Sequence, residues 1–342
     1  MLAASVAGAA DSTTPPAKPA VDLRLHPTGG RTAITVHTGL FITNIVAVDE
    51  TRESFEVGGY LIARWKDPRL VLAAGQGAPQ GSESTRTFKS DELWSPPIEA
   101  ANTISHKTAQ YSLTVDNEGM VTYVERFDAV FSNYFAMRKF PFDSQVLRFE
   151  FQPFLSSAHE FVFAPEALPI SGLSPTQHSE LAAWRMGALR YSIEKPSRPD
   201  LVDHSGDALF EVAIQRRSGF YVWKIMLPLL MMTMIPVVVF WLDPKEFDWI
   251  LKVPLTMLLS MVAFQFSVVR DLPKVEYVTF LDAMFLASFL FCFIAIIEIT
   301  TVYLIQRGHR RNLAVVVHAA GRWAYPLAYF LLILLVAVFL LL

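Results

Sequence analysis

Four long apolar runs in the last third of the chain constrain its fold more than any other feature. A helix that spans a membrane needs about 20 mainly apolar residues. Each run is long enough for such a helix once its flanking residues are included. The runs are Ile225 to Leu242, Val253 to Val269, Ala283 to Ile305 with Glu298 as its single charge, and Trp323 to Leu342. The sequence therefore predicts four membrane-spanning helices in the C-terminal part of the chain.

Charged side chains divide the chain near residue 219. Residues 1–219 carry 45 of them and residues 220–342 carry 16, of which 13 fall in three short stretches between the apolar runs. This division predicts a water-soluble domain over residues 21–219 and a membrane domain over residues 220–342. Residues 1–20 start with the Ala-rich MLAASVAGAA and include three prolines, so we expect a flexible lead-in or the remnant of a signal peptide there.

Basic residues in the short linkers predict the orientation in the membrane. The linker after the third run holds Arg307, Arg310, Arg311 and Arg322, more than any other linker. Basic linkers stay in the cytoplasm. With four spans, we therefore expect the N-terminal domain and the C-terminus on the extracellular or periplasmic side of the plasma (inner) membrane.

The N-terminal domain has the period of strands rather than helices. Apolar and polar residues alternate along Leu147–Gln152 and again along Phe210–Gln215. Such alternation is typical of strands with one buried face, and turn sequences separate the runs. We therefore expect an antiparallel β-sandwich followed by a four-helix transmembrane bundle.

Motifs of enzymes and of metal sites are absent from the sequence. It contains no glycine loop for phosphate, no Gly-x-Ser-x-Gly turn and no histidines at metal-ligand spacing. Isolated histidines such as His106 are expected at the surface or in hydrogen bonds. The net charge of −3 argues against a nucleic-acid partner. The sequence thus predicts a protein that is not an enzyme and needs no cofactor or metal.

Several motifs together resemble the pentameric ligand-gated ion channels, over about residues 22–342. They are Phe140–Gln145 (FPFDSQ), Trp65–Leu70 (WKDPRL), Leu93–Pro96 (LWSP), Arg216–Pro228 at the entry to the first helix, Leu272–Lys274, and Ile297–Glu298. The resemblance implies a homopentamer in membrane lipid, with ligand sites between the extracellular domains of adjacent subunits and a pore lined by the second helix.

In two features the sequence differs from the animal members of this family and resembles the bacterial members. Animal members close the FPFD loop with a disulfide, whereas Asn133 and Leu147 stand at the equivalent positions here. Animal members also carry a long insert before the last helix, whereas only residues 307–322 intervene here. The one cysteine, Cys292, lies in an apolar run and cannot form an intramolecular disulfide.

The resemblance implies which residues of the second helix face the pore. Alignment on Leu272–Pro273 places one set inward: Asp248, Lys252, Thr256, Leu259, Ala263, Phe266 and Arg270. Five-fold rings of Leu259, Ala263 and Phe266 would form an apolar gate that excludes water when closed. A plain helix-bundle core would also contain such residues, so the gate rests on the resemblance.

Charge selectivity depends on opposing features at the cytoplasmic mouth. Asp243, Glu246 and Asp248 would concentrate cations there, and the Pro-Ala pair typical of the family's anion channels is absent. Lys252 opposes this, although pairing with Asp248 at i,i+4 would neutralise it. We expect permeant monovalent cations, with an anion-selective member of the same family as the alternative.

The resemblance also implies a junction between the domains and a ligand site. Matching positions for coupling are Glu50, Asp143, Arg216, Pro273 and Lys274, with Arg216 as the shared hub. Matching positions for ligand binding are Phe154, Tyr191 and Phe210, beside the loop from Lys195 to Gly206. The tip of that loop contains no aromatic residue, so the agonist stays open between an unknown small molecule and protons.

Two further interpretations remain open from the sequence. A membrane-anchored extracellular binding module without conduction would share the same domains. Glu298, an acid within the third apolar run, is a functional candidate because ionisable groups inside membranes are expensive to bury.

Overall fold

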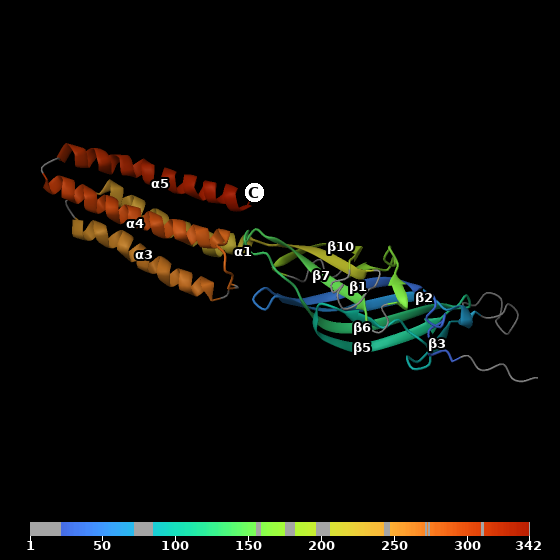
Figure 1. Ribbon diagram of the computed structural model, residues 1–342. Coiled ribbons are helices and arrows are strands. Elements are labelled where there is room, and N and C mark those ends of the chain that lie inside the picture. Colours follow the sequence, from blue (N-terminus) through green and yellow to red (C-terminus); the bar gives the residue numbers. More distant parts are fainter. Residues whose placement is uncertain are drawn as a thin grey trace, which may run out of the picture.

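The computed structural model describes residues 22–71, 85–154, 159–174, 182–195, 206–242, 247–270, 272, 274–308 and 311–341, with Arg311 by its backbone only. Figure 1 shows an elongated molecule, with the strands at one end and the helices at the other. Residues 1–20, the predicted lead-in, lie outside the described residues.

The strands of the described residues form two sheets that pack face to face. One sheet has seven strands in the order β3-β5-β6-β2-β1-β8, with β9 also paired to β1, and the other has the order β10-β11-β7-β4. The bounds are β1 (Ile34–Asp49), β2 (Ser54–Lys66), β3 (Arg86–Phe88), β4 (Ile98–Ala100), β5 (Thr103–Val115), β6 (Met120–Ser132), β7 (Ser144–Pro153), β8 (Phe161–Phe163), β9 (Gly172–Leu173), β10 (Trp184–Glu194) and β11 (Asp207–Arg216). The predicted β-sandwich is confirmed.

Aromatic side chains join the two sheets. Phe55 of β2 and Phe131 of β6 stack at 5.5 Å, and the Phe149 ring of β7 meets both edge-on at 5.1 and 5.0 Å. Edge-to-face and offset pairs at this separation add to the burial of apolar area. The predicted alternation holds along β7, where Leu147, Phe149 and Phe151 are buried and Arg148 is exposed.

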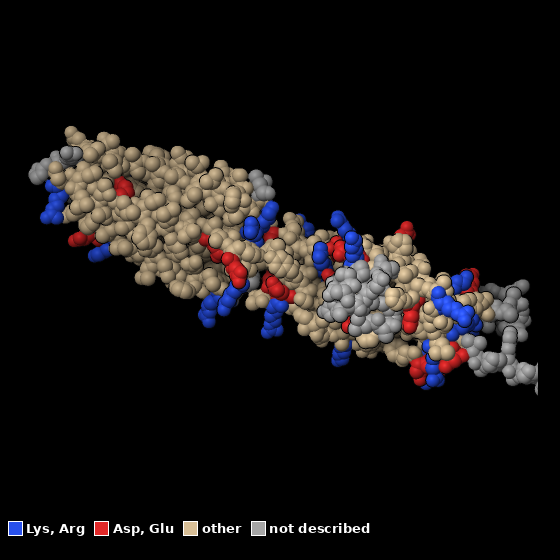
Figure 2. Space-filling view, viewed as in Figure 1, with Lys and Arg blue, Asp and Glu red and all other residues tan. Residues whose placement is uncertain are grey.

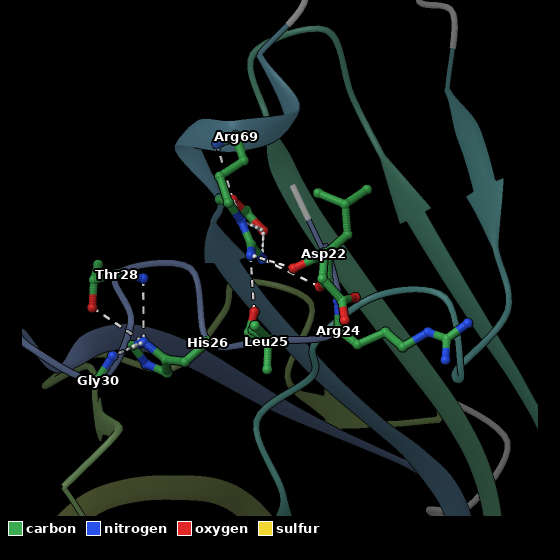
Figure 3. Close-up of polar contacts among 9 residues, drawn as sticks. Asp22, Arg24, Leu25, His26, Thr28, Gly30 and Arg69 are labelled. Atoms are coloured by element: carbon green, nitrogen blue, oxygen red, sulfur yellow. Dashed lines mark hydrogen bonds and ion pairs between the residues drawn. The ribbon is translucent and has the colours of Figure 1, made fainter. Parts of the chain in front are cut away.

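The motif Trp65–Leu70 (WKDPRL) lies at the end of the sandwich farthest from the helices, and Figure 3 shows its Arg69 with the start of the described chain. The Asp67 side chain caps the short helix η1 (Pro68–Leu70) by accepting from the Arg69 backbone N–H at 3.0 Å. The Arg69 guanidinium binds Asp67 and also donates to the carbonyls of Asp22 and Leu25 at 3.2 and 2.9 Å. WKDPRL therefore ties the start of the described chain to the sandwich.

Four helices within the described residues are long and apolar enough to cross a membrane. The first runs over Gly219–Trp241 and comprises α1 (Gly219–Tyr221), η4 (Val222–Met226), α2 (Leu227–Met234) and η5 (Ile235–Trp241). The others are α3 (Phe247–Val269), α4 (Phe280–Arg307) and α5 (Arg311–Leu341). Figure 2 shows few charged side chains on the helical part except near its ends, and many over the sheets.

Exposed tryptophans lie near both ends of the helical bundle. Trp223 is close to the sheets, whereas Trp241 and Trp249 are close to the opposite ends of their helices. Trp323 of α5 lies beside Trp241, and all four are exposed. The Trp241 and Trp323 rings meet edge-on at 6.3 Å. Tryptophan is enriched at both membrane–water interfaces, so these rings mark the two borders of the apolar layer.

Candidate functional site

Arg216, the last residue of β11, lies between the two domains with its guanidinium buried between two acids. Its Nε and Nη2 donate to Asp143 Oδ1 and Oδ2 at 2.8 and 3.2 Å, and its Nη1 donates to Glu50 Oε1 at 2.8 Å. Only 3% of the Arg216 side chain and 2% of the Asp143 side chain are exposed. The junction is therefore a buried, bidentate ion pair with a second acid at its rim.

Aromatic rings surround the same guanidinium. Its Cζ lies 4.2 Å from the ring centre of Trp184, 4.8 Å from that of Phe140 and 5.9 Å from that of Tyr221. Burial alone would lower the pKa of Arg216, but hydrogen bonds and charges from Asp143 and Glu50 outweigh it and raise that pKa. Arg216 is therefore a fixed positive charge at any physiological pH.

Gln145 holds Asp143 in place, and the sequence predictions missed its role. Its Nε2 donates to Asp143 Oδ2 at 2.6 Å and to the Ala136 carbonyl at 2.9 Å. A signal for it was present, because Gln145 is in phase with the buried Leu147, Phe149 and Phe151. A polar residue at an inward position of a strand requires a buried partner.

The loop between β6 and β7 connects this junction to the helices. The Met137 backbone N–H donates to the Tyr277 hydroxyl at 2.8 Å, and the Phe280 backbone N–H donates to the Arg138 carbonyl at 3.1 Å. Lys139 Nζ donates to the Leu341 carbonyl at 2.7 Å. One loop thus contacts the linker after α3, the start of α4 and the end of α5.

The two remaining coupling positions lie in the linker after α3. Pro273 is outside the described residues. Lys274 is exposed and lines a cavity of about 260 Å³ together with Met137 and Phe140 of the β6–β7 loop and Val269 of α3. The cavity lies between the end of α3 and the loop.

A hydrogen bond closes the base of the β6–β7 loop. The Arg148 backbone N–H donates to Asn133 Oδ1 at 3.1 Å, directly beside Leu147. Asn133 and Leu147 are both buried. The resemblance places the disulfide of animal members at these two positions, and in this chain Asn133 forms a hydrogen bond to the neighbouring Arg148 backbone instead.

The seven residues expected to line the pore share one exposed face of α3. All of them are exposed, whereas Ile250, Pro254 and Met261 are buried. At about 100° per residue, the seven positions fall within an arc of about 80°. The exposed set is Asp248, Lys252, Thr256, Leu259, Ala263, Phe266 and Arg270.

The cytoplasmic end of this face carries Lys252, which is exposed. Among the ion pairs of the described residues, none joins Asp248 to Lys252, although they are four residues apart on α3. The neutralising pair expected from the sequence is therefore not formed. Asp243 and Glu246 lie outside the described residues.

The three aromatic residues expected at the ligand site do not form one surface. Phe210 is fully buried against Phe151 and Tyr191, at 6.0 and 4.8 Å, so its ring cannot contact a ligand directly. The Tyr191 hydroxyl donates to the Ala164 carbonyl at 2.7 Å. Phe154 is 48% exposed and lines a separate cavity. Phe210 was predicted to bind ligand because it lies beside the loop from Lys195 to Gly206. A position along the chain does not determine the direction in which the ring points.

Two adjoining cavities flank Glu125 in the extracellular sandwich. One of about 340 Å³ is lined by Phe154, Glu99 and His106, and the other of about 420 Å³ is lined by Tyr111 and Tyr123. Glu125 lines both. The sequence predictions did not single out Glu125, although it is in phase with the buried Phe127, Ala129 and Phe131 on β6.

Glu298 of α4 contacts His318 of α5. Its Oε1 lies 3.2 Å from His318 Nδ1, and both side chains are largely buried. Glu298 Oε2 and His318 Nε2 are buried without a hydrogen-bond partner. The acid within the third apolar run therefore joins α4 to α5.

Two family descriptions match this architecture along most of the chain. "Neurotransmitter-gated ion-channel ligand binding domain" matches residues 21–218, and "Neurotransmitter-gated ion-channel transmembrane region" matches residues 225–319. The chain belongs to the neurotransmitter-gated ion-channel family. Members of this family are ligand-gated ion channels that assemble as pentamers, not enzymes.

Curated members of the neurotransmitter-gated family include one from a bacterium and several from animals. A proton-gated ion channel of Gloeobacter violaceus is 27% identical over 300 residues, which cover 87% of this chain and 81% of that protein. A gamma-aminobutyric acid receptor subunit beta-like of Drosophila melanogaster is 24% identical over 84% of this chain and 60% of that protein. The glycine receptor subunit beta of Rattus norvegicus is 24% identical over 85% of this chain and 59% of that protein.

Membership of the neurotransmitter-gated family confirms several predictions from the sequence. The protein is a multi-pass plasma-membrane channel of the prokaryotic pentameric type, with its N-terminal ligand-binding domain on the extracellular side. The β-sandwich and the four-helix bundle follow the order expected for the family.

Proposed function

We propose that this chain forms a homopentameric, ligand-gated channel whose pore is lined by the exposed face of α3. The extracellular domain comprises residues 21–219 and the pore domain residues 220–342. Helices α4 and α5 face membrane lipid on the outside of the bundle, because many of their large apolar side chains are exposed on the single chain.

The exposed face of α3 is the observation that carries this proposal. A pore needs a continuous face that its own subunit does not bury. Leu259 and Phe266 are 71% and 72% exposed on the single chain, so a pore, a partner subunit or lipid must cover them. The charged residues Asp248 and Lys252 on the same face favour the pore over lipid. Five copies of Leu259, Ala263 and Phe266 would form a dewetting gate.

The Arg216 junction is the proposed route from ligand to gate. A rearrangement of the sandwich would move Glu50 and Asp143 against Arg216, which begins the path into the first helix. The β6–β7 loop would carry the same movement to Tyr277 and Phe280. From there it would reach the C-terminal end of α3, which precedes Lys274. Both contacts of that loop are direct hydrogen bonds.

We further propose cation selectivity, supported by Asp248 at the cytoplasmic end of the exposed face and by the acids Asp243 and Glu246 nearby in the sequence. The specific observation that favours an anion-selective channel instead is Lys252, which is exposed on the same face and forms no ion pair with Asp248. Five lysines in a ring would repel cations.

The proposed agonist is a small molecule bound between the extracellular domains of adjacent subunits, or extracellular protons. Protons are supported by the relative named a proton-gated ion channel. The alternative from another functional class is an extracellular binding module that does not conduct ions. Only a conductance measurement separates it from a channel.

Recordings from the purified full-length protein in planar bilayers test this function. We expect currents at acidic extracellular pH or with an added amine or carboxylate, with a reversal potential that follows the sodium or potassium gradient. A reversal potential that follows chloride would contradict cation selectivity alone. No conductance under any of these conditions would contradict the channel function.

Lys252 provides a variant that discriminates between the two selectivities. If Lys252 faces the pore, Lys252→Thr should raise the permeability to cations relative to chloride, because a ring of five charges is removed. Lys224→Thr, near the extracellular end of the first helix, is the matched control. Equal selectivity in both variants would place Lys252 away from the ion path.

A further inference from the structure

We propose that residues 26–32, which form a turn just before β1, are an acid-operated clasp: the turn is closed while the His26 ring is neutral and opens when the ring takes up a proton. The clasp lies at the same end of the sandwich as Arg69 and the start of the described chain (Figure 3). Its opening changes hydrogen bonds within one subunit and needs no ion flow. The proposal therefore goes beyond the proposed channel function and is tested separately from it.

Two backbone donors of the clasp converge on one ring nitrogen. The N–H groups of Thr28 and Gly30 donate to His26 Nδ1 at 3.2 and 3.1 Å (Figure 3). Gly29 and Gly30 have φ angles of 65° and 76°, and this left-handed conformation turns the chain back toward the ring. No atom lies within 4 Å of the position that a Cβ would take at either glycine, so glycine serves here for its backbone conformation rather than for space.

The partners of the His26 ring require it to be neutral. A backbone N–H can only donate, so Nδ1 must present its lone pair to Thr28 and Gly30. Nε2 lies 2.9 Å from the carbonyl oxygen of Glu160, which can only accept, so the ring hydrogen is on Nε2. The Trp94 ring meets the imidazole edge-on at 4.8 Å and fixes its orientation. The closed clasp thus selects the neutral form with its hydrogen on Nε2.

A proton on Nδ1 would replace the acceptor of the clasp with a donor. The Nδ1 hydrogen would then face the N–H groups of Thr28 and Gly30, and both hydrogen bonds would be lost. The Thr28 hydroxyl oxygen lies 3.1 Å from Nδ1 and can accept the new hydrogen, because its own hydrogen goes to the Thr32 carbonyl at 2.8 Å. The bond from Nε2 to Glu160 can persist in both states. The open and closed clasp therefore differ in the amides of Thr28 and Gly30.

The charges around the clasp give a protonated His26 no partner while the turn stays closed. The titratable and charged groups of the surrounding elements are Asp22, Arg24 and Arg31 on the same segment, Asp67 and Arg69 at η1, and His159 and Glu160 before β8. Among the ion pairs of the described residues, none includes His26. Arg69 is paired with Asp67, and Figure 3 shows Arg24 pointing away from the ring.

The direction of the pH response follows from the protonation state of the closed clasp. Histidine changes its charge between about pH 5 and 8. The closed clasp excludes the second proton, so it is present at neutral and alkaline pH and is lost as the pH falls through this range. Arg69 donates to the carbonyls of Asp22 and Leu25 at 3.2 and 2.9 Å and stays charged throughout. The opening is therefore confined to the clasp.

Hydrogen–deuterium exchange of the full-length protein in detergent tests the clasp, with rates corrected for the intrinsic effect of pH on amide exchange. We expect protection of residues 27–31 to fall by about fivefold or more from about pH 8 to about pH 5, because hydrogen bonds of about 1 kcal/mol each are lost. The Ile34 amide, which donates to the Glu160 carbonyl at 2.9 Å, is the internal reference and should not change.

Two variants of His26 separate the acceptor from its titration. Asparagine accepts from the N–H two residues on and does not titrate, so His26→Asn should stay protected at both pH values. His26→Ala has no acceptor and should be unprotected at both. His37→Asn, at an exposed position of β1, is the control and should respond to pH as the wild type does.

The comparison of wild type with His26→Asn decides the question even if His26→Ala does not fold. The proposal is overturned if wild-type protection of residues 27–31 does not change with pH, if His26→Asn loses protection in acid as the wild type does, or if His37→Asn abolishes the change.

Discussion

At the scale of single residues, the Arg216 guanidinium combines charged and aromatic contacts at the end of the sandwich that leads into the first helix. It bonds to Asp143 and Glu50 and lies against the rings of Trp184 and Phe140. Removing one partner of a buried ion pair costs about 3–5 kcal/mol, because the other charge is left without compensation. We therefore expect the junction to transmit movement only while all three charges stay in contact.

Arg216→Ala should abolish evoked currents while pentamers still reach the membrane. Arg217→Ala is the matched control, since Arg217 is its exposed neighbour. Currents evoked by extracellular acid, or by any ligand that opens the wild type, are the measurement. The double variant Arg216→Ala with Leu259→Ala should still open spontaneously, which separates lost coupling from failed assembly. Normal evoked currents in Arg216→Ala would refute the coupling role.

Glu125 should make the extracellular domain sensitive to acid. Its pKa in the folded protein is lowered, so its contribution is present above the ordinary carboxyl pKa of about 4.3 and is lost as the pH falls through the lowered value. The difference in thermal unfolding midpoint between wild type and Glu125→Gln should therefore shrink as the pH falls from about 5 to 3. Tryptophan fluorescence reports this midpoint. A difference that grows in acid would contradict the pKa direction.

The sequence carried a residue-scale signal that identifies several of these groups. Glu125, Gln145 and Arg216 each occupy an inward phase of a strand otherwise filled by apolar residues. Period-two alternation thus predicts their burial. It cannot predict their partners, because Asp143 and Arg216 are 73 residues apart and only the sheet register brings them together.

At the scale of elements, the β6–β7 loop is the part of the sandwich that contacts the helices most widely. Asn133 closes its base through a hydrogen bond to the Arg148 backbone. A hydrogen bond is open to exchange, whereas a disulfide is covalent. The loop is therefore held by a contact of modest energy, and Asn133 determines its position at the end of β6.

Asn133→Ala should lower the stability of the extracellular domain by about 1–2 kcal/mol, because the Arg148 N–H would be left buried without an acceptor. The thermal unfolding midpoint of the pentamer checks this. Ser132→Ala, an exposed neighbour, is the control and should have little effect. Equal midpoints for Asn133→Ala and wild type would mean that the loop base is held by other contacts.

Element boundaries and faces were predictable to different extents. The four spans and the alternation of β7 followed from hydrophobic period alone, because each element buries one face. The positions of Phe154, Tyr191 and Phe210 relative to one another did not follow. Phe210 faces the core and Phe154 a cavity, a difference that depends on how β10, β11 and β7 pack rather than on local sequence.

At the scale of the whole molecule, a water-soluble sandwich and an apolar helical bundle meet at the charged junction around Arg216. The cavities of the sandwich and the exposed face of α3 lie in different domains (Figure 1). We therefore expect a ligand effect on the proposed pore to cross the Arg216 junction or the β6–β7 loop. The family and the domain order were predictable from motifs, whereas these cavities were not, because residues distant in sequence line them.

The most direct measurement of the central claim, that α3 lines a gated pore, is spontaneous current from Leu259→Ala in planar bilayers, which needs no agonist. Leu258→Ala, one residue away and packed toward the bundle, is the matched control. Widening an apolar ring should favour a wetted, open pore. We predict spontaneous openings in Leu259→Ala and none beyond wild type in Leu258→Ala. Two variants that are equally silent, or that open equally, would contradict the account.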